Sequence, residues 1–293
     1  MHDRLSEAVT ASDTTGATKA DATTVATLAP TPATQRAAMS AASDALDPAL
    51  HVKPYVHDSP TCKALHFSIS EVQSRMDPQD PLALVLQYTR TMMGFLLLHR
   101  SPRQIAMIGL GGGSLAKFCH HHLPEARIEV VEINPHVIAL RDEFQVPPDG
   151  DRFSVVHGDG ARFVRDRATP CDVLIVDGFT SDGMPRRLCS QRFYDDCHAM
   201  LQPGGVMVVN LHFGHRQYSR HVDRIHRSFE GEVLVVDDGG LSNSIVFACK
   251  GPVLDKAATG AARRPKALDR AAAKPLLGAL ALVTQALKDR RGD

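Results

Sequence analysis

The sequence predicts an α/β fold built on a doubly wound, mainly parallel sheet with helices on both faces. Between Gln104 and Cys249, short apolar runs alternate with stretches of helical periodicity, which is the pattern of repeated strand–helix units. The run from Cys171 to Asp177 is apolar at nearly every position, as expected of a strand that is covered on both faces. A glycine-rich turn at residues 109–113 joins the first of these strands to a helix.

The 293 residues divide by composition into four segments. We predict a disordered tail over residues 1–50, because this Ala- and Thr-rich stretch has no aromatic residue and too little apolar surface to offset its ordering entropy. All 11 Phe and 4 Tyr residues lie between Tyr55 and Phe247. The predicted segments after the tail are a β-hairpin and helix at 51–100, the main α/β domain at 101–252, and a low-complexity linker with a short C-terminal helix at 253–293.

Charge and cysteine usage narrow the class of protein. The 33 Lys and Arg residues balance 33 Asp and Glu residues, so we expect no nucleic acid and no membrane as a partner. No apolar run approaches the roughly 20 residues that span a bilayer, and the start does not resemble a secretory signal. We therefore expect a cytoplasmic protein. The six cysteines are scattered without a C-x-x-C pair, which argues against a disulfide framework and a structural zinc site.

The first folded elements precede the glycine-rich turn. Apolar and polar residues alternate from Leu65 to Ser70, which predicts a strand or hairpin that continues through Val72 and Gln73. Periodicity from Leu82 to Leu98 predicts a single helix. The preceding Asp80-Pro81 pair supplies a cap and a first-turn residue for it.

The elements of the main domain follow in order. Strands are predicted at 105–108, 128–133, 153–157, 171–177, 206–211, 232–236 and 244–249. Helices are predicted around 115–123 and 137–140. Near the end of the chain, an amphipathic helix is predicted from one apolar face made by Leu276, Leu277, Leu280, Val283 and Leu287.

The glycine-rich turn is the strongest indication of a ligand site. Gly109, Gly111 and Gly113 follow the first strand directly, and backbone without Cβ atoms can approach a ligand closely at the N-terminus of the next helix. Glu132 ends the second strand, where doubly wound folds place a carboxylate that accepts hydrogen bonds from ribose hydroxyls. The alternative is a packing turn and a solvated carboxylate.

Two further strand ends carry acidic residues. Asp159, followed by Gly160, could accept a hydrogen bond from the adenine amine or could form an ordinary Asp-Gly turn. Asp177 could orient a nucleophilic amine and accept its proton, or could cap the following loop. No phosphate-binding lysine follows the glycines, and Ser114 replaces the third glycine of a dinucleotide fingerprint. The three strand ends together favour an adenosyl-sulfonium ligand.

Several motifs occur in a fixed order over about residues 65–250. They are Gln73-Ser74, Tyr88, Gly109 to Ser114, Val131 to Asn134, Gly158 to Gly160, Val176-Asp177, Phe193-Tyr194 and Leu201 to Gly205. This combination resembles the spermidine synthase (polyamine aminopropyltransferase) family. Single motifs are shared with many methyltransferases, whereas the ordered set is specific.

The resemblance implies a Rossmann-like sheet of the adenosylmethionine-dependent methyltransferase type with a small N-terminal β-hairpin domain, usually in a homodimer. It implies transfer of an aminopropyl group from decarboxylated S-adenosylmethionine to putrescine or another small-molecule amine, with release of methylthioadenosine and without a metal. By position, Gln73 would contact the nucleoside, Glu132 the ribose and Asp159 the adenine. Asp177 would bind or deprotonate the amine beside Tyr88.

The departures from the family pattern concern acidic residues. Gly112 stands where the family's glycine loop has an Asp, and Thr180 stands at the second acid of its D-x-x-D-P loop, so Asp182 is the candidate substitute. The family's Tyr-His-Glu reads Tyr88-Thr89-Arg90. An alkyl ammonium, with a pKa of roughly 10.4, is held by carboxylates. These changes therefore weaken a site for a dication.

Three functions remain open from the sequence. The first is an aminopropyltransferase. The second is a methyltransferase that uses intact S-adenosylmethionine, whose carboxylate would be repelled by an acid at position 112. The third is a non-catalytic nucleoside-binding homologue. A metal site at His120-His121-His122 is not expected, because adjacent residues of a helix point in different directions.

Overall fold

The computed structural model describes residues 46–68, 71–180, 183–237, 243–259, 265 and 267–292. Residues 1–45 of the predicted tail lie outside the described residues, as do Asp182 and parts of the predicted linker at 260–264 and 266. Within the described ranges, every helix is too short or too polar to cross a bilayer.

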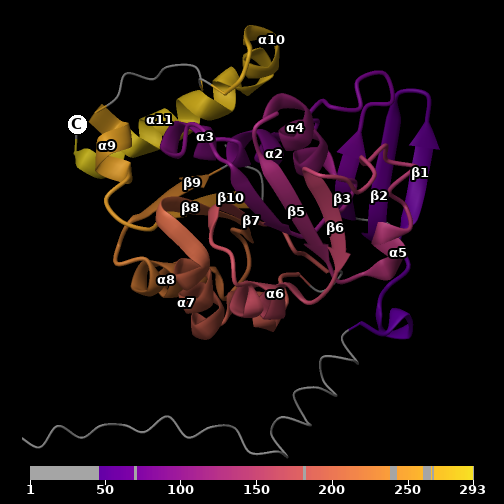
Figure 1. The fold of residues 1–293 in the computed structure, drawn as a ribbon, viewed down its shortest axis with the longest axis horizontal. Coiled ribbons are helices and arrows are strands. Elements are labelled where there is room, and N and C mark those ends of the chain that lie inside the picture. Colours follow the sequence, from indigo (N-terminus) through magenta and orange to yellow (C-terminus); the bar gives the residue numbers. More distant parts are fainter. Residues whose placement is uncertain are drawn as a thin grey trace, which may run out of the picture. The chain divides into compact units, whose positions relative to one another are not determined.

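A seven-stranded sheet forms the centre of the fold, with the strand order β6-β5-β4-β7-β8-β10-β9 (Figure 1). The strands are β4 (Gln104–Ile108), β5 (Arg127–Glu132), β6 (Phe153–His157), β7 (Cys171–Val176), β8 (Leu201–His212), β9 (Val233–Asp237) and β10 (Asn243–Cys249). The strands from β6 to β8 pair in parallel, and β10 is antiparallel to both of its neighbours. The predicted α/β class is confirmed. The strand order reverses between β4 and β7, where such sheets bind ligands.

Side chains alternate between the two faces of this sheet and form two cores. Ile105 and Met107 of β4 belong to one core, and Ala106 and Ile108 belong to the other. Helices cover both faces (Figure 1). The first core includes residues of α4 (Ser114–His122), α5 (Pro135–Ile138) and α11 (Leu277–Arg291), and the second includes residues of α6 (Gly160–Asp166), α7 (Gln191–Met200) and α8 (Tyr218–Ser228).

A small antiparallel sheet precedes the main domain. It consists of β1 (Tyr55–Ser59), β2 (Cys62–Ser68) and β3 (Glu71–Met76), so the predicted hairpin is extended by one strand. Leu65 and Met76 join the first core, which ties this sheet to the main domain. The pairing slips next to Leu65, whose partner is Ser74, while the partner of His66 is Val72. Gln73 is therefore the extra residue of a β-bulge.

The single helix predicted from Leu82 to Leu98 is wrong. The structure has two short helices instead, α2 (Gln87–Met92) and α3 (Phe95–Leu98). Asp80 pairs with Asp77 in an isolated bridge rather than capping a helix. The guanidinium of Arg90 donates hydrogen bonds to the carbonyls of Leu84 and Val85, at 2.5 and 3.3 Å. These bonds hold the preceding segment outside the helix.

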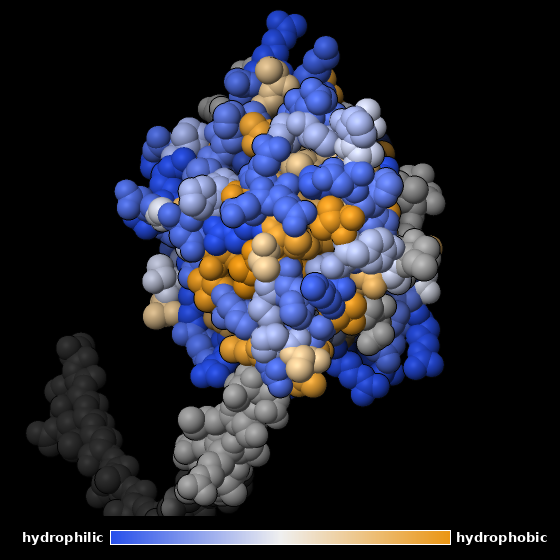
Figure 2. Space-filling model, turned by 90° about the vertical axis from the view of Figure 1, so that its right-hand side faces the viewer, coloured by the Kyte–Doolittle hydropathy of each residue, from blue (hydrophilic) through white to orange (hydrophobic). Residues whose placement is uncertain are grey.

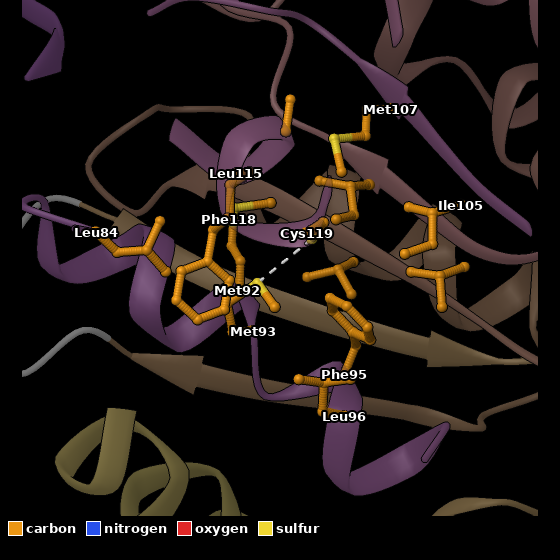
Figure 3. Close-up of a cluster of buried hydrophobic side chains, with 14 of the residues drawn as sticks. Leu84, Met92, Met93, Phe95, Leu96, Ile105, Met107, Leu115, Phe118 and Cys119 are labelled. Atoms are coloured by element: carbon orange, nitrogen blue, oxygen red, sulfur yellow. Dashed lines mark hydrogen bonds between the residues drawn. The ribbon is translucent and has the colours of Figure 1, made fainter. Parts of the chain in front are cut away.

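The helical segments α2 and α3 pack on α4 and β4 in the first core. Figure 3 shows that Met92 of α2 and Met93, the residue directly after this helix, face Phe118 and Cys119 of α4. The thiol of Cys119 donates to the Met93 sulfur at 3.9 Å. The cluster continues to Phe95 of α3, which is fully buried. This packing fixes the strand β4 that carries the glycine-rich turn.

The C-terminal segment also packs on the first core. It contains α9 (Leu254–Thr259), α10 (Arg270–Ala273), η3 (Lys274–Leu276) and α11. Leu280, Val283 and Leu287 are buried as predicted, whereas Leu277 is 56% exposed and does not belong to the buried face. Arg290 forms ion pairs with Glu232 and Asp255, at 3.1 and 2.7 Å.

Candidate active site

A cleft of about 1630 Å³ runs along the carboxyl ends of β4, β5, β7 and β8. The predicted site residues that line it are Gln73, Tyr88, Gly109, Gly111, Glu132, Asp159, Gly160 and Asp177. On the face that carries the small sheet, apolar side chains gather near the middle and hydrophilic ones surround them (Figure 2). Val52 and Val72 both line the cleft and are exposed, so part of its rim is apolar.

The glycine-rich turn lets the ends of β4 and β7 touch. Gly109 has a φ of 94°, and a Cβ atom there would lie 2.2 Å from the carbonyl oxygen of Asp177. Its N–H donates to the carbonyl of Val131 on β5 at 2.8 Å. Gly113 does not line the cleft. It caps α4, and its Cα faces a Val146 methyl group.

Gly112, which stands where the family's glycine loop has an Asp, has no room for a side chain. A Cβ atom on Gly112 would lie 2.7 Å from the Phe144 ring and 2.7 Å from the Ser74 hydroxyl. Phe144 is 1% exposed and belongs to the first core. A side chain at Gly112 would therefore require Phe144 or Ser74 to move.

Glu132 is a buried carboxylate held by the backbone. One oxygen accepts from the N–H of Leu110 and the other from the N–H of Asn134, both at 2.8 Å. Burial raises the pKa of Glu132 above its ordinary value, and these N–H groups and His51 oppose that rise. Each carboxylate oxygen can accept further hydrogen bonds. Glu132 can therefore accept bonds from a pair of hydroxyls in the cleft.

Asp159 caps a helix and forms an ion pair. One oxygen accepts from the backbone N–H of Arg162 in the first turn of α6, at 2.8 Å. The other lies 3.1 Å from the guanidinium of Arg187, which belongs to η2 (Arg186–Cys189). Asp159 is thus the N-cap of α6, and Gly160 is the first residue of this helix rather than part of an Asp-Gly turn. An adenine contact by Asp159 stays a prediction, and it would have to share the carboxylate with Arg187.

Asp177 is held by side chains from other elements rather than by the loop that follows it. Its carboxylate accepts from the Tyr88 hydroxyl at 3.1 Å and from the Asn210 amide at 2.9 Å. The amide of Asn243 donates to Asn210 at 2.9 Å. Burial raises the pKa of Asp177, although both hydrogen bonds oppose the rise. The arrangement gives a preoriented, poorly solvated proton acceptor next to the glycine-rich turn.

The small sheet and the segment before it close the Glu132 end of the cleft. Gln73 lines the cleft from its bulge, in keeping with the use of bulges to redirect side chains next to active sites. Leu50 and His51 also line it. The segment is fixed by a hydrogen bond of 2.9 Å from the Asn134 amide to the Val52 carbonyl.

Basic residues bear on an amine site, and among the described residues Arg186, Arg187 and Arg216 line the cleft. Arg90 binds backbone carbonyls and is not among the residues that line the cleft. Arg187 pairs with Asp159. Thr180 lines the cleft and forms a tight turn with Gly183, through reciprocal backbone hydrogen bonds of 3.0 Å. Among the described lining residues the carboxylates are Glu132, Asp159 and Asp177.

Some residues of the site were missed by sequence reasoning. Asn210 could have been found in the same way as the acidic residues, because it also lies near the carboxyl end of a strand, β8. Asn243 and His221 line the cleft only through tertiary packing. Within the described ranges, no group of three or more His, Cys, Asp or Glu side chains is placed to hold a metal ion.

Comparison with known proteins identifies relatives of this chain. The family model described as "Spermine/spermidine synthase domain" matches residues 85–230. The polyamine aminopropyltransferase of Chromobacterium violaceum is 40% identical over 204 residues, which are 69% of this chain and 78% of that protein. The enzyme of the same name from Neisseria meningitidis serogroup A is 38% identical over 188 residues, 64% of this chain and 72% of that protein.

A solved structure shows the same fold. The probable spermidine synthase from Corynebacterium glutamicum has a TM-score of 0.59 and 23% sequence identity, and the match covers 67% of this chain and 76% of that one. The sequence relatives carry the stronger argument, because identity of 40% over most of a relative's length goes beyond shared architecture. The chain belongs to the spermine/spermidine synthase family of transferases.

Proposed function

We propose that this chain transfers an aminopropyl group from decarboxylated S-adenosylmethionine to a small-molecule amine. The observation that carries the proposal is the buried Asp177 carboxylate, held by Tyr88 and Asn210. It lies in one cleft with Glu132 and the glycine-rich turn. The cleft would thereby combine a nucleoside site, at Glu132 and the glycine-rich turn, with a proton acceptor, Asp177.

The donor would occupy the end of the cleft at β4 and β5. Glu132 accepts hydrogen bonds from both ribose hydroxyls with the lone pairs that Leu110 and Asn134 leave available. Gly111 lies open to the cleft, since a Cβ atom there would make only ordinary contact with Ser74. Gln73 would contact the nucleoside and Asp159 the adenine, and Gly160 lines the same part of the cleft.

Asp177 would orient the acceptor and take its proton. The sulfonium supplies a carbon that is activated for displacement. The amine nitrogen forms a bond to that carbon, the carbon–sulfur bond breaks, and its electron pair stays on sulfur as the neutral thioether of methylthioadenosine. Asp177 receives the proton that the nitrogen loses. Tyr88 and Asn210 hold the carboxylate in place while the acceptor enters.

The first test is product analysis by mass spectrometry. Purified protein, decarboxylated S-adenosylmethionine and a panel of amines are expected to give methylthioadenosine and an aminopropylated amine. Intact S-adenosylmethionine is the matched control, because Gly112 lacks the acid that would repel a methionine carboxylate. Release of adenosylhomocysteine in that control, with no methylthioadenosine, would replace the proposal by a methyltransferase. No product from folded protein with either donor would contradict both.

Replacement of Asp177 separates acceptor chemistry from donor binding. Asp177→Asn keeps the shape but removes the proton acceptor, so kcat is expected to fall by about 10²–10⁴. Donor affinity, measured by calorimetry, is expected to change less than threefold. A matched loss of donor affinity would mean that Asp177 belongs to the donor site instead.

A further inference from the structure

Three arginines line the cleft, and the proposed reaction gives none of them a role. The guanidinium of Arg187 lies 3.1 Å from the Asp159 carboxylate. The side chains of Arg186 and Arg216 are exposed, and they form no ion pair and no hydrogen bond with a described residue. A guanidinium on a cleft wall that no carboxylate neutralises is available to an anionic group of a ligand.

Arg186 belongs to a segment that folds back against the end of β7. It is the first residue of η2, which follows the loop after Asp177. A Cβ atom on Gly178, the residue directly after Asp177, would lie 2.8 Å from a Leu188 methyl group of η2. Gly178 and Leu188 both line the cleft. The turn that carries Arg186 is therefore packed at the end of the cleft that holds Asp177.

Arg216 belongs to the loop that leads from β8 into α8. This loop begins just after Asn210, whose amide donates to Asp177 at 2.9 Å. The helix that follows the loop is tied to η2, because the guanidinium of Arg224 on α8 donates to the Cys189 carbonyl at 2.5 Å. The segments that carry the two unpaired arginines thus adjoin each other at the Asp177 end of the cleft.

The charges at this end do not suit a dication. Of the three carboxylates among the described lining residues, Glu132 lies at the end of β5 and Asp159 is paired with Arg187. Asp177 remains for the ammonium group that reacts. A second ammonium group on the acceptor would be repelled by the two unpaired arginines, whereas a carboxylate would be attracted to them.

We propose that Arg186 and Arg216 bind a carboxylate of the acceptor, so that the acceptor is an amine that carries a carboxylate at its other end. Its ammonium group then lies at Asp177 and its carboxylate at the arginines, each beside a group of opposite charge. The planar guanidinium matches a carboxylate with parallel N–H groups. This inference rests on the proposed function, because it names the class of acceptor that the same cleft takes.

The test uses sets of acceptors with equal carbon number, each with an ω-amino carboxylate, a diamine and an alkylamine. 4-Aminobutyrate, putrescine and n-butylamine form one set, and the sets run from two to five carbons. The donor is decarboxylated S-adenosylmethionine, and released methylthioadenosine is measured. In at least one set we expect the wild-type KM of the amino carboxylate to be about tenfold below that of the alkylamine, the effect of two exposed ion pairs. The diamine should have no such advantage.

Charge-removing variants locate the origin of this preference. Arg186→Gln combined with Arg216→Gln is expected to raise the KM of the amino carboxylate about tenfold, to the level of the alkylamine. The KM of the alkylamine should change less than twofold. Arg216→Gln alone should have about a threefold effect. Arg220→Gln is its matched control, because Arg220 is an exposed residue of α8 that does not line the cleft, and it should leave the preference unchanged.

The possible results separate this inference from the proposed function. A wild-type protein that forms methylthioadenosine without a lower KM for the amino carboxylate in any set would overturn the role of the arginines alone. An equal rise in KM for all acceptors in the double variant, or the same loss in Arg220→Gln, would do so as well.

Calorimetry of the double variant with intact S-adenosylmethionine covers the remaining alternative. Unchanged affinity is expected, because the donor is proposed to bind at β4 and β5, whereas the arginines follow β7 and β8. A tenfold loss would mean that the arginines bind the carboxylate of that donor, and it would overturn this inference. A wild-type protein that forms no methylthioadenosine with any acceptor would overturn both proposals.

Discussion

Glu132 and Asp177, two buried carboxylates of one cleft, differ in what holds them. Glu132 accepts from the backbone N–H groups of Leu110 and Asn134, which cannot move independently of the sheet. Asp177 accepts from side chains, the Tyr88 hydroxyl and the Asn210 amide. Side-chain donors can rotate when a ligand enters. The first arrangement suits a fixed binding group, and the second suits a group that exchanges a proton.

Tyr88→Phe is expected to change the pH dependence of the reaction in a defined direction. The hydrogen bond from Tyr88 lowers the pKa of Asp177, against burial, which raises it. Its removal raises that pKa further, so the ionised base is lost at a higher pH. The pH below which kcat/KM falls should therefore be higher in the variant than in the wild-type protein.

The wild-type protein, assayed with the same amine, is the reference for this comparison, because the protonation of the amine affects both proteins equally. We expect kcat near neutral pH to fall about tenfold, the effect of one hydrogen bond to a charged group. An unchanged profile with a lower kcat would indicate that Tyr88 positions the substrate without acting on Asp177.

At the residue scale, the sequence predicts strand-end groups well and tertiary contacts poorly. Glu132, Asp159 and Asp177 all line one cleft, because the carboxyl ends of parallel strands share one edge. His221 could not be found in this way, since its position depends on how α8 packs. Arg187 beside Asp159 depends on the path of a loop, which no periodicity encodes.

At the scale of elements, the contact between the ends of β4 and β7 places the glycine-rich turn next to Asp177. The Asp177 N–H donates to the Ile108 carbonyl at 2.9 Å. Directly after it, Gly109 turns with its Cα against the Asp177 carbonyl. A side chain at this point would push the two strand ends apart. The distance between the glycine-rich turn and the Asp177 carboxylate thus depends on one missing Cβ atom.

Gly109→Ala is expected to destabilise the protein by at least about 2 kcal/mol more than Gly251→Ala. The two glycines have similar φ values, 94° and 90°. The Cβ atom at Gly109 would lie 2.2 Å from the Asp177 carbonyl oxygen, whereas the one at Gly251 would have nothing within 4 Å. The comparison therefore cancels the backbone strain that alanine suffers at both sites. Urea unfolding measures the free energy of unfolding of both variants. Equal losses would show that the close contact between the ends of β4 and β7 contributes nothing to stability.

The helix that the sequence predicted from Leu82 to Leu98 shows the limit of periodicity. The apolar pattern from Leu82 to Leu98 continues through Gly94, where the chain breaks between α2 and α3. A Cβ atom on Gly94 would lie 2.7 Å from a Val283 methyl group of α11. The absence of a side chain at Gly94 therefore accommodates a helix nearly 200 residues later in the sequence. A local pattern contains no information about such a partner.

At the scale of the whole molecule, alternating strands and helices predict the class of the sheet, and chain chirality limits its topology. The docking of the small sheet on the main domain is less predictable. It depends on Leu65 and Met76 entering the first core, and it brings Gln73 to the cleft wall. The resemblance to the family predicts the small N-terminal sheet beside the main domain, whereas composition and spacing do not predict how it docks.

The buried Lys117 of α4 makes global stability depend on pH. Its ammonium donates to the Phe144 carbonyl at 2.7 Å and contacts the Met76 sulfur at 3.0 Å, and it forms no ion pair with a described residue. Burial lowers the pKa of Lys117 to about 8. In the unfolded chain its pKa is roughly 10.4. Between these values the unfolded chain binds more protons than the folded one, so this group makes stability rise with pH.

Lys117→Met is expected to remove this contribution. Burial raises the pKa values of Cys119 and Tyr194, so these two groups lower stability at alkaline pH in both proteins. The effect of the lysine is therefore seen only in the difference between the wild type and the variant. That difference in unfolding free energy, from urea titrations, should be constant below about pH 8. From there to about pH 10.5 it should shift in favour of the wild type. A difference independent of pH would mean that the Lys117 ammonium is solvated in the folded protein.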